Sequence, residues 1–141
     1  MAVRCPFGRP AVIEQPAYLD DGSPFPTTYF LTCPHAVARI GALESAGGVD
    51  RYERLVAEGG DAAAEYRAGA DRQRALRRPV ARMADGGASL ALGVGGTRRD
   101  GAVKCLHAHA AFALAQPAYA FGRRIVAEAE PLFPTGECCT A

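Results

Sequence analysis

Glycine and proline divide this chain into short segments and so limit the length of any helix or strand that it can form. Sixteen glycines and ten prolines make up 26 of its 141 residues. Proline interrupts helices and central strands, and glycine favours turns. Because one hydrophobic core usually serves about 100–200 residues, a chain of this length is expected to be one domain. The sequence therefore predicts a single domain over residues 1–141, built from short elements.

The first 34 residues have the character of short strands joined by turns. Two apolar runs, at residues 3–5 and 11–13, flank a loop that contains proline and glycine, as in a hairpin. β-Branched and aromatic residues fill positions 27–32, which makes this segment the strongest strand candidate. It ends at Cys33-Pro34, where proline lacks the N–H that a sheet requires. Residues 1–34 are thus predicted to form a small β and turn region.

Apolar residues at helical spacing dominate the remainder of the chain. A helical region over 35–82, a Gly-rich loop over 83–101, a second helical region over 103–130 and a Cys-containing tail over 131–141 are expected. The individual helices are predicted at 35–46, 49–57, 61–78, 103–115 and 119–129. The Gly-rich loop does not match the glycine spacing of a nucleotide-binding loop. The predicted fold class is α+β, a single compact domain with a small N-terminal sheet or hairpin and several α-helices.

The charge of the chain is nearly balanced, with 16 basic and 15 acidic residues. Domains that bind nucleic acid are usually strongly basic, so the sequence carries no strong nucleic-acid signal. The basic residues are nearly all arginine, and six of them lie between residues 67 and 82. The helix expected at 61–78 is therefore rich in arginine and poor in apolar residues. It is predicted to be partly exposed or to pack against a protein partner.

The compartment bears on how the cysteines are interpreted. The sequence holds no apolar run of 18 residues and does not begin with a signal-peptide pattern, so we expect a cytoplasmic protein without a membrane span. Structural disulfides are rare in that compartment. No Cys-x-x-Cys pair is present. The five cysteines are therefore candidates for metal binding or catalysis: Cys5, Cys33, Cys105, Cys138 and Cys139.

The densest cluster of reactive side chains is Lys104-Cys-Leu-His-Ala-His109. In a helix that begins at residue 103, Cys105 and His109 are four residues apart and share a face, where they could bind one metal ion. At about 100° per residue, His107 would lie about 200° around that helix from Cys105 and would point away from it. A thiol in the first turn of a helix ionises more easily than an ordinary thiol. Cys105 is thus a candidate ligand or nucleophile, and the alternative is a buried thiol that packs as a small apolar group.

Several segments together form a recognisable pattern: Cys5-Pro-Phe-Gly-Arg-Pro10, Asp21-Gly-Ser-Pro-Phe-Pro-Thr-Thr-Tyr-Phe-Leu-Thr-Cys-Pro34, Ala64-Glu-Tyr-Arg67, Val103-Lys-Cys-Leu-His107 and Gly136-Glu-Cys138. In these segments the chain resembles the DUF501 family, an uncharacterised bacterial family common in actinobacteria. The resemblance implies no activity, but it does single out positions. The family's recurring cysteines correspond to Cys5, Cys33, Cys105 and either Cys138 or Cys139. Its recurring histidine corresponds to His107, whereas helical spacing favours His109.

The leading hypothesis is a metal-centre protein in which thiolates from Cys5, Cys33, Cys105 and Cys138 or Cys139 converge, with His107 and His109 as further candidate ligands. An iron–sulfur cluster in a structural, redox or sensing role fits the dispersed cysteines and the two Cys-Pro steps. Zinc is the alternative metal, although its ligands usually occur in close pairs.

Two other functions stay open at this point. One is an adaptor that binds another protein through the Arg-rich helix at 61–78. The other is a thiol enzyme with Cys105 as the nucleophile and His107 or His109 as its base. Two residues along a helix is a poor spacing for a Cys–His pair, so a non-helical backbone would be needed there.

Overall fold

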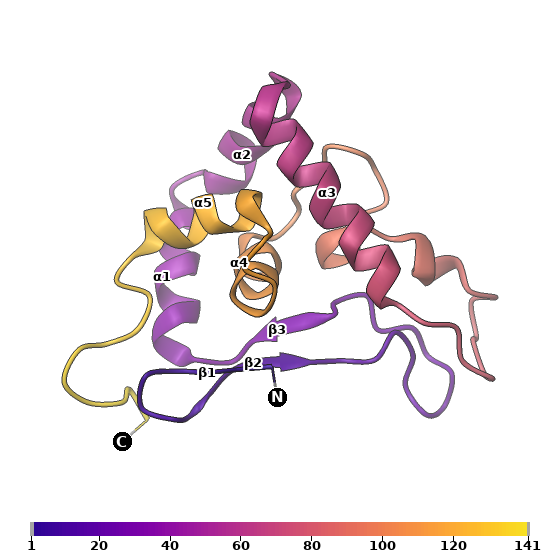
Figure 1. Cartoon of the computed structure of the whole chain (residues 1–141), viewed down its shortest axis with the longest axis horizontal. Helices are drawn as coiled ribbons and strands as arrows, with labels where there is room; N and C mark the ends of the chain where they lie inside the picture. Colours follow the sequence, from indigo (N-terminus) through magenta and orange to yellow (C-terminus); the bar gives the residue numbers. More distant parts are fainter. Residues whose placement is uncertain (1, 141) are drawn as a thin grey trace.

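Three antiparallel strands form one layer of the molecule, and five helices pack above it (Figure 1). The computed structural model describes residues 2–140. The strands are β1 (Val3–Arg4), β2 (Pro10–Glu14) and β3 (Tyr29–Leu31). The helices are α1 (Pro34–Ser45), α2 (Gly48–Ala57), α3 (Gly60–Leu76), α4 (Leu106–Ala115) and α5 (Ala120–Ala129). The predicted α+β class, a small N-terminal sheet with several helices in one compact domain, is confirmed.

The sheet has the simple order β1-β2-β3, so each strand pairs with its neighbour in the chain. Val12 of β2 lies opposite Leu31 of β3, and both side chains are buried. In the turn between β1 and β2, the N–H of Cys5 donates to the carbonyl of Arg9 at 2.8 Å. The hairpin predicted from the two apolar runs is therefore present, and its turn carries the first cysteine.

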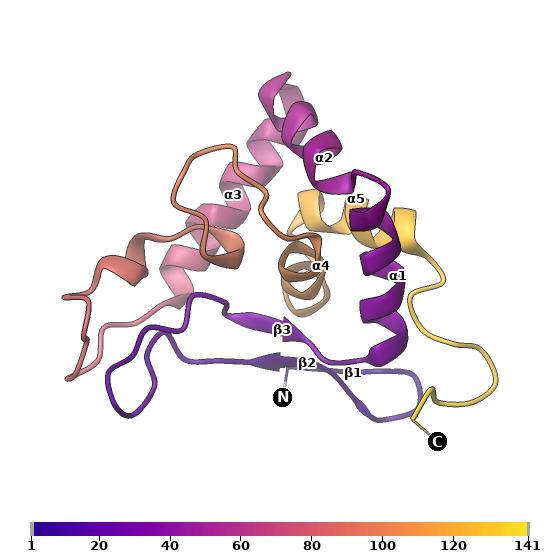
Figure 2. The ribbon, with the colours of Figure 1, turned by 180° about the vertical axis from the view of Figure 1, so that it is seen from behind.

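Helix α4 is the centre of the molecule, enclosed by β3, α1 and α5 in both views of the ribbon (Figures 1 and 2). Its sequence, Leu-His-Ala-His-Ala-Ala-Phe-Ala-Leu-Ala, has no polar face, as expected of a helix that is buried all round. Its small side chains allow close packing. A Cβ atom added to Gly122 of α5 would lie only 2.4 Å from the carbonyl oxygen of His109. Glycine at this position is therefore needed for the contact between α4 and α5.

His109 lies in this core and has no exposed surface. Its Nε2 is 3.0 Å from the carbonyl oxygen of Val103, and its Nδ1 is 2.7 Å from the hydroxyl of Tyr119. A carbonyl can only accept, so Nε2 carries the proton and Nδ1 accepts from Tyr119. Burial lowers the pKa of His109 to about 4. His109 is thus a neutral core residue with both nitrogens occupied, which corrects its prediction as a metal ligand or catalytic base.

Helix α3 packs against the body through a narrow face that includes Ala63, Tyr66 and Gln73. Arg74 in this helix and Arg77 directly after it form hydrogen bonds within the molecule. The guanidinium of Arg77 is buried and donates to the carbonyls of Ser89, Pro26 and Ala17 at 3.2–3.4 Å. Arg74 donates to the carbonyl of Ala91 at 2.9 Å. These contacts hold the Gly-rich segment, so the arginine run does not in itself indicate a partner surface, and the predicted adaptor function stays a prediction.

The Gly-rich segment makes two short 3₁₀ helices, Ala88–Ala91 and Val94–Gly96. A short strand, which alternating apolar residues at 90–94 would allow, does not form there. Within residues 2–140, none of the helices combines the length and apolar character that crossing a bilayer requires.

We predict that Arg77→Ala destabilises the protein by about 2–3 kcal/mol, because it removes a buried charged donor shared by three carbonyls. Urea unfolding followed by circular dichroism measures the change. The matched control is Arg78→Ala, which removes an adjacent, exposed arginine and should leave the unfolding midpoint unchanged. Equal effects of the two substitutions would contradict the role assigned to Arg77.

We also predict that the free energy of unfolding falls at acidic pH and that part of this fall depends on His109. The folded pKa of about 4 lies below the ordinary value of 6.5, so the unfolded chain binds the extra proton between these pH values. Stability from this source is present above about pH 6.5 and is lost as the pH falls toward 4. Between pH 7.5 and pH 4.5 the wild-type protein should lose about 2–3 kcal/mol more than His109→Gln. Urea titrations at the two pH values test this, and parallel losses in both proteins would exclude it.

Candidate functional site

The five cysteines, all free thiols, occupy two separate places in the structure. Cys105 lines a cavity of about 320 Å³ between β3, α1 and the start of α4. The other four cysteines line a second cavity of about 310 Å³, where the hairpin turn, the start of α1 and the tail meet. The prediction that Cys105 converges with the other cysteines is therefore wrong, because Cys105 lines a different cavity.

The backbone before α4 makes a tight turn that determines where Cys105 points. Lys104 has a φ of 65°, and the N–H of Cys105 donates to the carbonyl of Val103 at 2.7 Å. A left-handed residue other than glycine costs about 1–3 kcal/mol and persists only where its surroundings hold it. His109 supplies such a constraint, because its Nε2 donates to the same Val103 carbonyl. The core histidine thus supports the turn that presents the thiol.

Cys105 lies immediately before α4, in extended backbone, and not inside the helix as predicted. The helix begins at Leu106, so the argument that paired Cys105 with His109 by helical spacing does not apply. The chain instead turns the thiol towards His107. Two residues that are two positions apart in a helix point in different directions. Cys105 and His107 can still make contact, because only His107 is in the helix.

His107 connects Cys105 to an acidic residue of α1. The Nδ1 of His107 forms an ion pair with the Oε1 of Glu44, and its Nε2 lies 3.0 Å from the carbonyl oxygen of Val37. Single atoms of Glu44, Cys105 and His107 all lie within 4.8 Å of one another. The Glu44 and His107 side chains are each only 27% exposed, so the pair is partly shielded from solvent. The group is therefore a Cys–His–Glu arrangement with two anchors on α1.

The electrostatics of this group favour a charged pair. Burial raises the pKa of the Cys105 thiol, but the interactions with His107 and with the backbone amide of Ala108 outweigh it, so the pKa lies below its ordinary value. Contact with Cys105 has the largest effect on His107, and the Val37 carbonyl and Glu44 add to it. Together they raise the pKa of His107 to about 9 despite its burial. At neutral pH His107 is therefore an imidazolium, and its charge makes the adjacent Cys105 thiol easier to ionise.

The cavity next to Cys105 is mostly apolar. Pro26, Tyr29, Leu31 and Val37 line it, and Lys104 contributes its cation. Small-molecule sites are commonly concave, largely apolar and a few hundred Å³ in volume, with a few polar groups.

A larger depression of about 530 Å³ lies between α2, α3 and the loop near residue 100. Its charged side chains pair with one another, as Arg67 does with Asp100 and Arg99 with Glu53. No thiol or imidazole lines this depression. The smaller cavity beside Cys105 is therefore the better candidate site.

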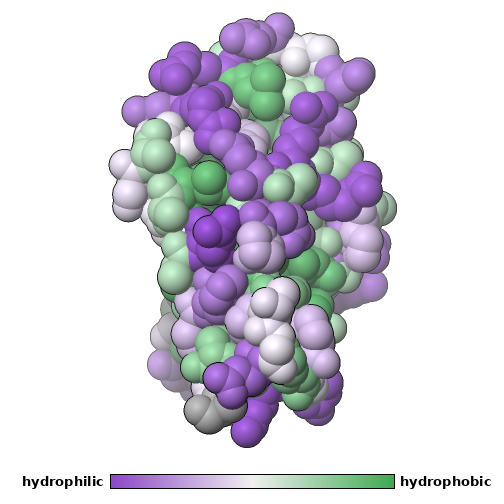
Figure 3. All heavy atoms as spheres, turned by 90° about the vertical axis from the view of Figure 1, so that its left-hand side faces the viewer, coloured by the Kyte–Doolittle hydropathy of each residue, from purple (hydrophilic) through white to green (hydrophobic). Residues whose placement is uncertain are grey.

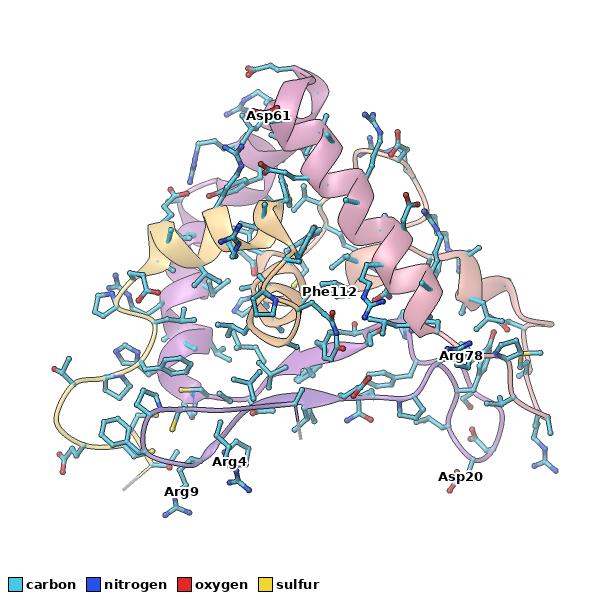
Figure 4. All side chains as sticks on the ribbon, viewed as in Figure 1. Arg4, Arg9, Asp20, Asp61, Arg78 and Phe112 are labelled. Atoms are coloured by element: carbon cyan, nitrogen blue, oxygen red, sulfur yellow. The ribbon has the colours of Figure 1, made fainter. Side chains whose placement is uncertain are left out.

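The second thiol group joins three distant parts of the chain. The Sγ atoms of Cys33 and Cys139 lie 3.9 Å apart, and Cys138 lies beside Cys5 and Cys139. Cys33 precedes the first residue of α1, and Cys5 begins the hairpin turn. Arg4 and Arg9 mark the end of this hairpin in Figure 4, where the tail returns towards it. The two Cys-Pro steps singled out in the sequence are therefore brought together by the fold.

Glu44 is the site residue that the sequence did not indicate. It lies in the last turn of α1, 63 positions before His107, and belongs to no local motif. Only the packing of α1 against α4 brings the two side chains together. The structure thus shows five cysteines, some of them close together, and one Glu–Cys–His group that could hold a metal ion.

Comparison with known proteins places this chain in a family. No curated protein and no solved structure matches it. A family model does match residues 1–127, a range that includes Cys5, Cys33, Cys105 and His107 and ends before the tail cysteines. The resemblance found in the sequence is thereby confirmed: the chain belongs to DUF501, a family of proteins of unknown function.

Proposed function

We propose that the protein is an enzyme in which Cys105 is a nucleophile for acyl transfer. One observation carries this proposal: a thiol of lowered pKa at a helix N-terminus faces a histidine that an acidic residue orients. A nucleophile, a base and a residue that orients the base are the recurring elements of covalent catalysis by side chains. The strained backbone at Lys104, directly beside the thiol, is also typical of functional sites.

The reaction begins with attack of the Cys105 thiolate on the carbonyl carbon of an ester, thioester or amide. A C–S bond forms, and the bond to the leaving group breaks as the imidazolium of His107 protonates that group. The proton comes from Nδ1, which faces the Glu44 carboxylate, because the N–H of Nε2 stays on the Val37 carbonyl. Water then attacks the thioester, His107 accepts the proton from the water, and the carboxylic acid leaves as the thiol anion is restored. Backbone N–H groups in the first turn of α4 have no partner within the helix. The amide of Ala108 faces the Cys105 sulfur, and those of Leu106 and His107 are the candidates to bind an oxyanion.

The cavity indicates the class of substrate. Its apolar wall, formed by Tyr29, Leu31 and Val37, suits a small acyl group with little polarity. Lys104 adds a positive charge to the lining, which favours a substrate with an anionic group. We therefore infer a small acyl compound with an acidic group near the scissile bond.

A second candidate is a catalytic metal on the same residues, favoured by the proximity of one ligand atom each from Glu44, Cys105 and His107. Catalytic zinc sites use three protein ligands and keep one position open. Binding would require His107 to lose the proton that its raised pKa retains at neutral pH. The nucleophile is therefore the preferred function, and the iron–sulfur hypothesis for a centre that includes Cys105 has no second thiol in this cavity to support it.

The proposal predicts an unusually reactive Cys105. Alkylation by iodoacetamide, resolved by residue with mass spectrometry, should give Cys105 an apparent pKa below the ordinary thiol value of about 8.5. His107→Asn should raise that pKa and slow alkylation at neutral pH about tenfold or more, because the thiolate loses its charged partner. Hydrolysis of activated acyl esters should fall at least about 100-fold in Cys105→Ser.

The matched control is His35→Asn, which changes another histidine next to α1 that contacts the Leu132 carbonyl and not Cys105. It should leave the alkylation profile of Cys105 unchanged. An ordinary pH profile for Cys105 that His107→Asn does not alter would refute the nucleophile. A bound metal ion that is lost in Cys105→Ser and that protects this thiol from alkylation would establish the metal candidate in its place.

A further inference from the structure

Few contacts hold the C-terminal tail to the rest of the molecule. From residue 135 onward, all its described residues except Cys138 are exposed, so burial of apolar surface contributes little there. The last hydrogen bond that anchors the backbone beyond α5 to the body is from His35 to the carbonyl of Leu132. Across residues 133–140, the hydrogen-bonding contacts to the body are between thiols: Cys139 with Cys33, and Cys138 with Cys5. Figure 3 shows the side of the molecule that carries the tail as a mixture of hydrophilic and hydrophobic residues.

The tail nevertheless returns to the hairpin (Figure 1). Four cysteines line the cavity at this point of return. Cys5 and Cys33 belong to the body and are buried, with exposed fractions of 7% and 4%. Cys138 and Cys139 come from the tail. We propose that Cys5, Cys33, Cys138 and Cys139 bind one zinc ion, which fastens the tail to the hairpin turn and to the start of α1.

The separation of two sulfurs supports a single tetrahedral ion. Thiolates about 2.3 Å from a tetrahedral zinc ion lie about 3.8 Å from each other. The observed distance between Cys33 and Cys139 is 3.9 Å. In a four-iron cluster each thiolate binds a different iron, which spaces the sulfurs more widely. A single ion therefore fits this pair better than such a cluster does.

The surroundings also suit four thiolates on a divalent ion, which together carry a net negative charge. Cys33 lies at the N-terminal end of α1, where the helix dipole favours negative charge. Arg9 lines the same cavity and adds a cation, and the proline after each body cysteine stiffens the loop around it.

The four sulfurs are connected as a chain, with Cys138 between Cys5 and Cys139, and Cys139 beside Cys33. The four sulfurs must draw closer together to hold one ion, because among the described residues the only three ligand atoms that all lie within 4.8 Å of one another are those of Glu44, Cys105 and His107. Cys138 and Cys139 are the less buried pair, so the tail is the part with more room to move. A site that closes only on binding is usual for structural zinc, since its binding energy contributes to folding.

The test uses the full chain purified under reducing conditions, with metal content measured by mass spectrometry. About one zinc ion per chain is expected. Reconstitution with Co²⁺ should give the intense visible absorption of a tetrahedral thiolate site. Cys139→Ser should abolish both signals and leave the circular dichroism spectrum unchanged, because Cys139 is an exposed tail residue. Cys33→Ser should act in the same way.

Cys105→Ser is the matched control and should retain full zinc content, which separates this site from the Glu44–Cys105–His107 group. Failure of the proposed nucleophile would not affect the result. The proposal is overturned if the reduced protein binds no zinc, or if Cys139→Ser and Cys33→Ser keep it. A brown protein that contains iron and sulfide would overturn it as well. So would a metal-free protein whose mass is lower by two hydrogen atoms because of a Cys33–Cys139 disulfide.

Discussion

The hydrogen bond from His109 to the carbonyl of Val103 is the interaction on which the candidate site depends. It joins the most buried helix to the turn that precedes it, and that turn holds Lys104 in left-handed backbone. Tyr119 completes the arrangement, because its hydroxyl donates to the other nitrogen of His109 and fixes the ring. The pairing is possible only because Gly122 lets α5 approach the backbone of α4. The contacts that pack the core therefore also determine the position of Cys105.

Helix α1 links the two thiol groups. Cys33 lies immediately before its first residue, and Val37 and Glu44 further along contact His107. A metal ion at its start would hold the helix that positions His107 through Val37 and Glu44. The proposed zinc site would therefore have a structural role, and its ligands would be separate from Cys105 and His107, the residues of the proposed enzyme.

The fold class could be predicted because its signals are local. Alternation of apolar residues, strand-forming residues before Cys33-Pro34 and regular helical spacing each act within about ten positions. The role of Arg77 could not be predicted, because the sequence around an arginine does not reveal whether its guanidinium binds carbonyls or lies in solvent. In the structure the guanidinium of Arg77 binds three carbonyls. The distinction depends on residues 17, 26 and 89, which lie far apart in the chain.

The sequence by itself determined the order of elements, the cysteine positions and the importance of the Lys104–His109 segment, because composition and short-range spacing decide these. Only the tertiary structure decided which residues in that segment meet. Helical geometry favoured His109, but the strained turn moves Cys105 out of the helix, buries His109 and leaves His107 beside the thiol. Glu44 joins them only through the packing of α1 on α4. Contacts of this kind depend on how helices pack in three dimensions, and no local pattern in the sequence encodes them.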